Sequence, residues 1–184
     1  MRQCWQMWDS VVSHRVCDEI ILKAKNAEEV AGETWADLTE NNPSKHRISN
    51  LRWLNDTATY SLLWEYAREA NRIAFGFELT DASPVQFTEY SSENNGKYDW
   101  HHDINWENNN AFDRKVSVVL QLTNGDSYEG GDFQFKEVET PDEKALRRKG
   151  SVLCFPSYLT HRVTPVTKGV RNSLVAWFEG PRWR

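Results

Sequence analysis

Two segments in the N-terminal half of the chain carry apolar residues at helical spacing. The first covers residues 13–27 and the second residues 57–75, where Asn55 or Asp56 can cap the N-terminus and Gly76 can end the helix. Charged side chains occupy the opposite faces, as in helices that cover a core. The predicted buried faces consist of Val16, Ile20 and Ala24, flanked by Cys17 and Ile21, and of Leu62, Leu63, Tyr66, Ala70 and Ile73.

From Val85 onward the pattern changes to the alternation of β-strands, interrupted by clusters of Gly, Asn, Asp and Pro. The predicted strands are 85–90, 97–104, 115–122, 132–138, 151–155, 161–166 and 170–179. Two helices followed by about seven short strands predict an α+β fold in which the helices pack on a β-sandwich or jelly roll.

Three stretches between the strands are predicted to be loops or turns. The charged run 140–149 is typical of a solvated loop rather than of a functional basic patch. The Asn-rich residues 105–113 are predicted to form either a lid or an ordinary surface loop. Gly130 and Gly131 are expected to permit a tight turn between two strands.

The length and composition of the chain limit the classes of protein to which it can belong. The 184 residues suit one domain, with residues 1–80 as a helical support region and residues 85–179 as the core. A net charge of −5 argues against a nucleic-acid binder that works mainly by charge. The sequence contains no apolar run long enough for a transmembrane helix and no signal-peptide pattern. The three cysteines form no metal-binding spacing and leave one unpaired in any disulfide scheme, so we expect a reduced, intracellular protein. Because no signal peptide or transmembrane segment is evident, we expect a cytoplasmic location.

Nine tryptophans suggest either aromatic walls around a ligand or a core built from large side chains. The set that precedes the strands is predicted to pack helices on the sheet, or alternatively to form an aromatic cleft for a proline-containing peptide. That set consists of Trp5, Trp8, Trp35, Trp53 and Trp64. Trp100 and Cys154 are expected in the core, whereas Trp106 is either a lid anchor or a local contact.

One short motif contains side chains that can bind a metal ion. On a strand, His101 and Asp103 point to the same face and can grip one cation. His161 opens another predicted strand, and two histidines with one carboxylate form the facial triad of non-haem Fe(II) oxygenases. Arg171 and Ser173 share a strand face, and a guanidinium binds a carboxylate through two hydrogen bonds. A dicarboxylate co-substrate fits these parts, with one end on iron and the other on Arg171.

Several sequence motifs occur along the chain in the same order as in a known enzyme family. They are Tyr98-x-x-His101-x-Asp103, Tyr128-Glu129-Gly130-Gly131-Asp132-Phe133, Gly150-Ser151-Val152-Leu153-Cys154-Phe155-Pro156-Ser157 and His161-Arg162-Val163-x-Pro165-Val166-x-x-Gly169-x-Arg171. Over about Val85 to Phe178 the chain resembles the prolyl 4-hydroxylase branch of the 2-oxoglutarate/Fe(II) dioxygenases. Within that branch it is most similar to small bacterial and phage hydroxylases of the PKHD type. The resemblance implies a double-stranded β-helix (jelly roll) with two N-terminal helices packed on the sheet.

The resemblance also implies roles for individual residues. The implied iron ligands are His101, Asp103 and His161. The implied 2-oxoglutarate contacts are Arg171 on the C5 carboxylate, Ser173, Tyr90, and Gln121, which stands where some relatives have a tyrosine and can still donate a hydrogen bond. The implied substrate-side residues are Tyr98, Arg114 and Trp177. Simple alternation would place Tyr98 on the face opposite His101, so its role requires a bulge or twist in the strand.

The implied reaction consumes 2-oxoglutarate and O2, releases succinate and CO2, and hydroxylates an unactivated C–H bond, with ascorbate as a possible reductant. Because Asp103 is present, where related halogenases have a small residue, hydroxylation is favoured. The first expected substrate is a prolyl residue of a peptide or protein, in the host cytoplasm if a phage encodes the enzyme. The alternatives are a free amino acid or other small molecule, a jelly-roll binding protein without turnover, and, ranked last because of the acidic charge, nucleic-acid demethylation.

Overall fold

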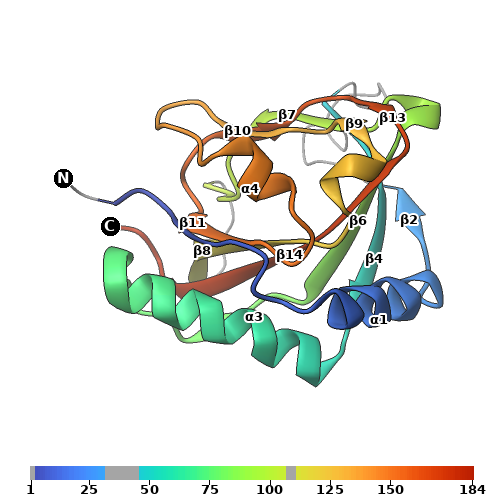
Figure 1. Ribbon diagram of the computed structural model, residues 1–184. Helices are drawn as coiled ribbons and strands as arrows, with labels where there is room; N and C mark the ends of the chain where they lie inside the picture. The colour runs from blue at the N-terminus through green and yellow to red at the C-terminus, as the bar shows by residue number, and fades with distance from the viewer. Residues whose placement is uncertain (1–2, 32–45, 107–110) are drawn as a thin grey trace.

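The computed structural model describes residues 3–31, 46–106 and 111–184. Two helices cover one face of an eight-stranded antiparallel sheet, and a four-stranded sheet lies over its other face (Figure 1). The larger sheet runs in the order β1 (Gln6–Trp8), β11 (Val152–Pro156), β8 (Phe112–Gln121), β14 (Val170–Pro181), β6 (Val85–Ser91), β4 (Asn50–Leu54) and β2 (Val30–Ala31), with β5 (Asp81–Ala82) paired to β14.

The second sheet lies above the larger one in Figure 1. It runs in the order β10 (Phe133–Phe135), β12 (His161–Val163), β7 (Lys97–His101) and β3 (Arg47–Ile48), and a short ribbon joins β13 (Val166–Lys168) to β9 (Glu129–Gly130). The helices are α1 (His14–Lys25), α3 (Thr57–Ala70) and α4 (Glu143–Arg147), with a π-helical turn at Asn71–Phe75. This arrangement confirms the predicted jelly roll with two N-terminal helices packed on the sheet.

The two long helices form where the sequence predicts them. Ser13 caps α1 by accepting a hydrogen bond from Val16 N–H, and Asp56 caps α3 through Thr59 N–H. Gly76 ends the second segment with φ +70°. One predicted core residue is wrong, because Ile73 is 48% exposed. It lies in the π-helical turn, whose wider backbone changes the angular position of each side chain and so breaks the buried stripe.

Strand alternation sorts the side chains of the large sheet into two cores. Val116, Val118 and Leu120 of β8 face the helices, whereas Val119 of the same strand packs on the other side. The second core lies between the sheets. It contains Tyr90, Phe133, Phe135, Leu153, Phe155, Leu159, Val163 and Val166. The large sheet therefore carries an apolar core on each of its faces.

Three further expectations need correction. The run 140–149 contains helix α4, and Arg147 within it is largely buried rather than solvated. Its guanidinium donates hydrogen bonds to three backbone carbonyl oxygens and to Asp132. Trp100 is 37% exposed and lies under the Arg162 guanidinium, because the face of β7 that carries it points to solvent rather than to the core. Trp53 is 42% exposed and does not pack a helix.

Two other tryptophans pack on helix α3 or its core as expected, whereas Trp5 packs on the core between the sheets and donates to the carbonyl oxygen of Glu139. Trp8 packs against Tyr66 of α3, and Trp64 packs against Phe178 at a centroid distance of 4.8 Å. Trp106 is 55% exposed beside His102. Trp35 lies outside the described residues, as do residues 107–110 of the expected loop at 105–113.

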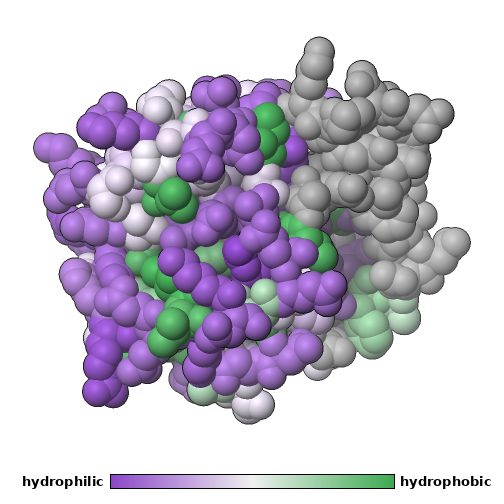
Figure 2. All heavy atoms as spheres, turned by 90° about the vertical axis from the view of Figure 1, so that its right-hand side faces the viewer, coloured by the Kyte–Doolittle hydropathy of each residue, from purple (hydrophilic) through white to green (hydrophobic). Residues whose placement is uncertain are grey.

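Within the described residues, every helix is too short or too polar to cross a membrane. Figure 2 shows polar side chains over most of the described atoms on one face, with apolar side chains in small separate groups. Scattered exposed hydrophobic side chains of this kind are normal for a protein surface.

The three cysteines are in the thiol form and differ in their access to solvent. Cys17 and Cys154 are fully buried, and this burial raises the pKa of Cys17 to about 11 and that of Cys154 well above its ordinary value. Since the thiolate is the reactive form, we expect one of the three thiols, Cys4, to react promptly with a disulfide reagent in the native protein. Spectroscopic titration should detect all three thiols only after the protein is denatured. Two prompt thiols in the native protein would contradict the described core.

Candidate active site

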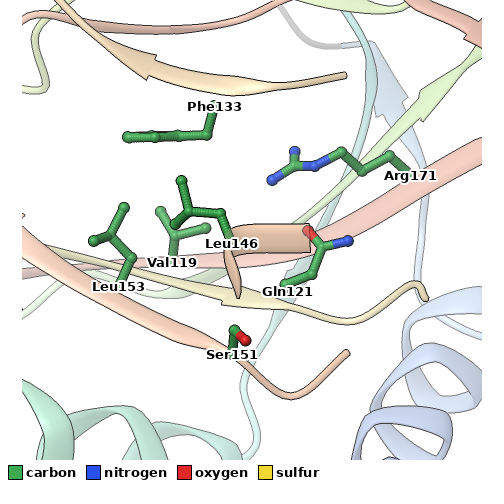
Figure 3. Close-up of a pocket in the computed structure, with 7 residues that line it drawn as sticks. All are labelled: Val119, Gln121, Phe133, Leu146, Ser151, Leu153 and Arg171. Carbon is green, nitrogen blue, oxygen red and sulfur yellow. The ribbon is translucent and has the colours of Figure 1, made fainter. Parts of the chain in front are cut away.

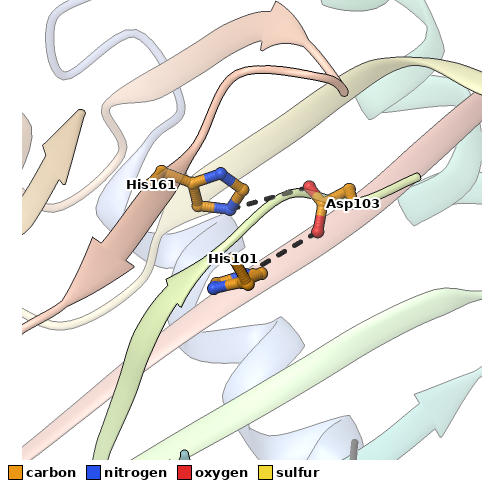
Figure 4. Close-up of side chains that lie close together, drawn as sticks. All are labelled: His101, Asp103 and His161. Carbon is orange, nitrogen blue, oxygen red and sulfur yellow. Dashed lines mark ion pairs between the residues drawn. The ribbon is translucent and has the colours of Figure 1, made fainter. Parts of the chain in front are cut away.

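Three potential metal ligands converge at one end of the interior. His101 ends β7, Asp103 follows two residues later, and His161 begins β12, which pairs with β7 so that the two histidines are direct partners in the register. Asp103 Oδ1 lies 3.8 Å from His101 Nε2, and its Oδ2 lies 3.7 Å from His161 Nε2 (Figure 4). All three ligand atoms lie within 4.8 Å of one another. Two atoms that bind one cation at about 2.1 Å lie about 3–4 Å apart, so the donor set fits a metal ion.

Backbone carbonyls orient both imidazole rings. His101 Nδ1 lies 2.7 Å from the carbonyl oxygen of Asp99, and His161 Nδ1 lies 2.9 Å from that of Leu159. A proton on each Nδ1 completes these hydrogen bonds and leaves the Nε2 lone pairs directed toward the shared centre. Burial, reinforced by the charge of neighbouring His161, lowers the pKa of His101 to about 3. Its ring is therefore neutral at physiological pH, which is the form that binds a metal.

The carboxylate of Asp103 is held in place from behind. The Ser117 hydroxyl of β8 donates to Asp103 Oδ2 at 2.6 Å and lies 2.9 Å from the Ser157 hydroxyl. Burial alone would raise the pKa of Asp103, but the two histidines, Arg114 and the Ser117 hydrogen bond outweigh it and hold the pKa below its ordinary value. Asp103 is thus ionised and fixed, as a metal-binding carboxylate must be.

Tyr98 lies beside the three residues, as its predicted role required. Its ring stacks on that of His101 with centroids 3.4 Å apart. The pairing of β7 with β12 shifts register between His161 and Val163, and this irregularity brings Tyr98 to the His101 side of the strand. The Arg47 guanidinium lies 4.6 Å above the Tyr98 ring from β3. Burial raises the pKa of Tyr98, so its phenol stays neutral.

A second feature of the interior is a narrow pocket that contains the Arg171 side chain (Figure 3). Its lining residues are Val119, Gln121, Phe133, Leu146, Ser151, Leu153 and Arg171. Arg171 is 4% exposed, and Phe133 stacks on His161 at a centroid distance of 5.4 Å. Phe133 therefore belongs to both regions, and the pocket adjoins the cluster of potential metal ligands.

The other predicted co-substrate residues surround the same arginine. Tyr90 is the register partner of Arg171 on β6, and the guanidinium lies 5.7 Å from its ring. Ser173 is 2% exposed and is the register partner of Gln121. A buried guanidinium in a mostly apolar pocket is suited to a carboxylate, because few competing waters reach it.

The remaining two predicted residues contact each other. The Arg114 guanidinium lies 3.8 Å above the Trp177 ring and its Nη1 lies 3.3 Å from the carbonyl oxygen of Asp103. Trp177 is 6% exposed, and its Nε1 has no hydrogen-bond partner among the described residues. Trp53 lies 6.4 Å from Trp177, an aromatic neighbour that strand alternation alone did not identify.

Sequence reasoning also missed Arg147. Its guanidinium donates to Asp132 Oδ1 and to three carbonyl oxygens, those of Gly130, Gly125 and Tyr128, at 2.6–3.0 Å. This residue ties α4, which contributes Leu146 to the pocket, to the turn that contains the two glycines. No signal in the sequence separates it from the neighbouring charged residues.

Comparison with known proteins gives the class of this fold and site. Residues 85–179, more than half of the chain, match the model of the 2OG-Fe(II) oxygenase superfamily. The chain belongs to that family, and it is a dioxygenase that depends on Fe(II), 2-oxoglutarate and O2. Within the family it resembles PKHD-type hydroxylases. One of these, from Synechococcus sp. (strain CC9311), is 28% identical over 174 residues, which cover 92% of this chain and 75% of the relative.

Solved structures show the same fold. The viral collagen prolyl hydroxylase from Paramecium bursaria Chlorella virus-1, in its complex with 2-oxoglutarate, gives a TM-score of 0.72 at 17% identity and covers 97% of both chains. A prolyl hydroxylase from Trichoplax adhaerens, in complex with a peptide fragment of the hypoxia inducible factor oxygen degradation domain, gives a TM-score of 0.70 at 17% identity, with 95% of this chain and 83% of that chain covered.

Proposed function

We propose that this dioxygenase is a prolyl hydroxylase of a peptide or protein, and that His101, Asp103 and His161 hold its iron. The observation that supports the metal assignment is the convergence of two oriented imidazole Nε2 atoms and one carboxylate within 4.8 Å. Bound Fe(II) supplies the chemistry by which 2-oxoglutarate and O2 give succinate and CO2 while a substrate C–H becomes C–OH. Ser117 keeps the carboxylate oriented during this reaction.

Arg171 is proposed to bind the C5 carboxylate of 2-oxoglutarate, with Tyr90 and Ser173 beside it and Gln121 in the same pocket. The pocket reaches Phe133, which stacks on His161, so a short dicarboxylate can extend from the iron to the guanidinium. Its apolar walls exclude water from the co-substrate and strengthen the ion pair. The inward alternation of β14 places Arg171 and Ser173 on the same face of the strand.

The substrate is proposed to lie along Tyr98, Arg114 and Trp177. Trp177 and Trp53 form an aromatic surface of the kind on which proline rings pack. The buried Trp177 Nε1 is a hydrogen-bond donor without a partner among the described residues, and a peptide carbonyl oxygen would satisfy it. Two structural neighbours are prolyl hydroxylases, and one of them holds a peptide. These features together favour a prolyl peptide over a free amino acid. We propose residues 1–184 as a single domain in which residues 1–80 support the core.

The test is incubation with Fe(II), 2-oxoglutarate and O2 and a panel of proline-containing peptides, followed by mass spectrometry. We expect a gain of one oxygen on a prolyl residue and succinate formation that rises with peptide. Reactions without 2-oxoglutarate, or with a metal chelator, serve as controls. Free proline and free lysine are assayed in parallel. If succinate formation rose only with a free amino acid, the substrate would be a small molecule rather than a peptide. The protein would still be an oxygenase.

A further inference from the structure

The amide of Gln121 has a defined orientation in the Arg171 pocket. Its Nε2 donates to the carbonyl oxygen of Thr123 at 2.8 Å and to the hydroxyl of Tyr128 at 3.2 Å. Its Oε1 is buried and accepts no hydrogen bond from the described residues. Figure 3 shows this oxygen on the side of the amide that faces Arg171. The pocket therefore presents an amide acceptor, rather than an amide donor, beside the guanidinium.

The groups that orient this amide are themselves fixed. Tyr128 is 3% exposed, and the Arg147 guanidinium lies 4.2 Å from its ring and donates to its carbonyl oxygen. Gly131, with φ +66°, lies between the ring of Tyr128 and the side chain of Arg171. A Cβ added there would approach Arg171 Cδ to 3.1 Å and Tyr128 Cε2 to 3.3 Å. The Tyr128 ring is thus packed against the same glycine as the arginine, and it has little room to move.

A carboxylate carries only acceptors, so it cannot bond to an amide oxygen. A guanidinium carries five N–H donors in a fork, of which a carboxylate uses two. Three donors then remain for another acceptor, and Gln121 Oε1, which accepts no hydrogen bond from the described residues, lines the same pocket as Arg171. The balance of donors and acceptors in the pocket thus favours a contact from Arg171 to Gln121 over a contact from Gln121 to the co-substrate.

We propose that Gln121 is a positioning residue that acts through Arg171: its oxygen accepts from the guanidinium and aligns it toward the distal carboxylate of the co-substrate. Tyr128 and the Thr123 carbonyl hold the amide in that orientation. This inference rests on the proposed 2-oxoglutarate pocket and replaces the expectation that Gln121 donates a hydrogen bond to the co-substrate.

The experiment measures dissociation constants of 2-oxoglutarate and of 2-oxovalerate, which has a methyl group in place of the C5 carboxylate, on the Mn(II)-loaded protein by calorimetry. Gln121→Met keeps the side-chain length and removes the acceptor. We expect this replacement to raise the dissociation constant of 2-oxoglutarate about tenfold, which corresponds to the loss of one hydrogen bond to a charged group. The dissociation constant of 2-oxovalerate should not change. In an Arg171→Met background, Gln121→Met should have no further effect, because the residue through which it acts is gone.

Tyr128→Phe is the second variant, and it leaves Gln121 in place. It removes one of the two acceptors that orient the amide, so we expect a smaller loss of 2-oxoglutarate affinity that also disappears in the Arg171→Met background. Tyr66→Phe, on α3 at the opposite side of the sheet, is the matched control and should change neither constant.

Three results would overturn the inference. One is an additive effect of Gln121→Met and Arg171→Met on 2-oxoglutarate, which indicates a direct contact with the co-substrate. Another is an equal loss for both keto acids, which indicates general damage to the pocket. The third is no effect of Gln121→Met at all. Failure of the proposed function looks different, because the unaltered protein would then bind 2-oxoglutarate no better than 2-oxovalerate.

Discussion

Asp103→Ala is expected to abolish 2-oxoglutarate turnover while the protein stays folded. Replacing a residue that only orients a metal ligand typically reduces metal affinity or activity by about 10–100-fold. Asp103 is proposed as a ligand itself, and it is the anionic member of the set, so its loss should exceed that range. Two neutral imidazoles remain after the replacement, and they offer neither the charge nor the third donor that fixes the ion. The measurement is succinate formation together with bound metal, by elemental analysis, after dialysis against Fe(II) or Mn(II).

The fold should survive this change because the groups that face the carboxylate keep other partners: the Arg114 guanidinium still lies 3.3 Å from the carbonyl oxygen of residue 103 and 3.8 Å above the Trp177 ring. Ser117, which donates to Asp103, also lies 2.9 Å from the hydroxyl of Ser157 and keeps that partner. Removing a buried carboxylate also relieves its desolvation. The depressed pKa of Asp103 indicates that its favourable contacts outweigh this cost, so thermal unfolding of the metal-free protein should shift slightly downward while the protein stays folded. Asp18→Ala, which removes an exposed ion pair between α1 and Lys149, is the control and should retain turnover. An Asp103→Ala protein that still binds metal and forms succinate would refute the ligand assignment.

The spatial clustering of the potential metal ligands could be predicted because it depends on two simple rules. Short sequence spacing keeps Asp103, which follows the end of β7, close to His101, and pairing of antiparallel strands can bring a distant residue such as His161 beside them. Strand periodicity correctly predicted that Arg171 and Ser173 share one face of β14. Each of these predictions needs only the residue type and its position along a strand.

The residues that orient these side chains could not be predicted in the same way. Ser117 reaches Asp103 from a strand of the other sheet, and Arg147 bonds carbonyl groups whose positions depend on the packing of α4. A charged residue in a charged run is solvated far more often than buried, so the pattern favoured the wrong environment for Arg147. The orientation of the Gln121 amide is likewise a property of its tertiary neighbours, Thr123 and Tyr128.

Arg171→Met is expected to weaken the binding of 2-oxoglutarate selectively, and by more than any other replacement in the pocket. Arg171 is 4% exposed, so the carboxylate it is proposed to bind would be desolvated together with it. Removing one partner of a buried, hydrogen-bonded charge pair typically costs about 2–5 kcal/mol, because the other charge is left without compensation. About 3–4 kcal/mol corresponds to a rise in the KM for 2-oxoglutarate of roughly 100- to 1,000-fold. Methionine fills much of the volume and adds no charge, so the pocket walls should hold their positions.

The same variant makes a sharper prediction with a keto acid that lacks the distal carboxylate. Turnover of 2-oxovalerate should be equal or better in Arg171→Met, because a methyl group gains from an apolar pocket and no longer faces a buried cation. The preference for 2-oxoglutarate over 2-oxovalerate should therefore collapse, while kcat at saturating 2-oxoglutarate changes little. Arg68→Met, an exposed arginine of α3, should leave this preference intact. If Arg171→Met lowered turnover of both keto acids equally, the arginine would support the structure of the pocket rather than recognise the carboxylate.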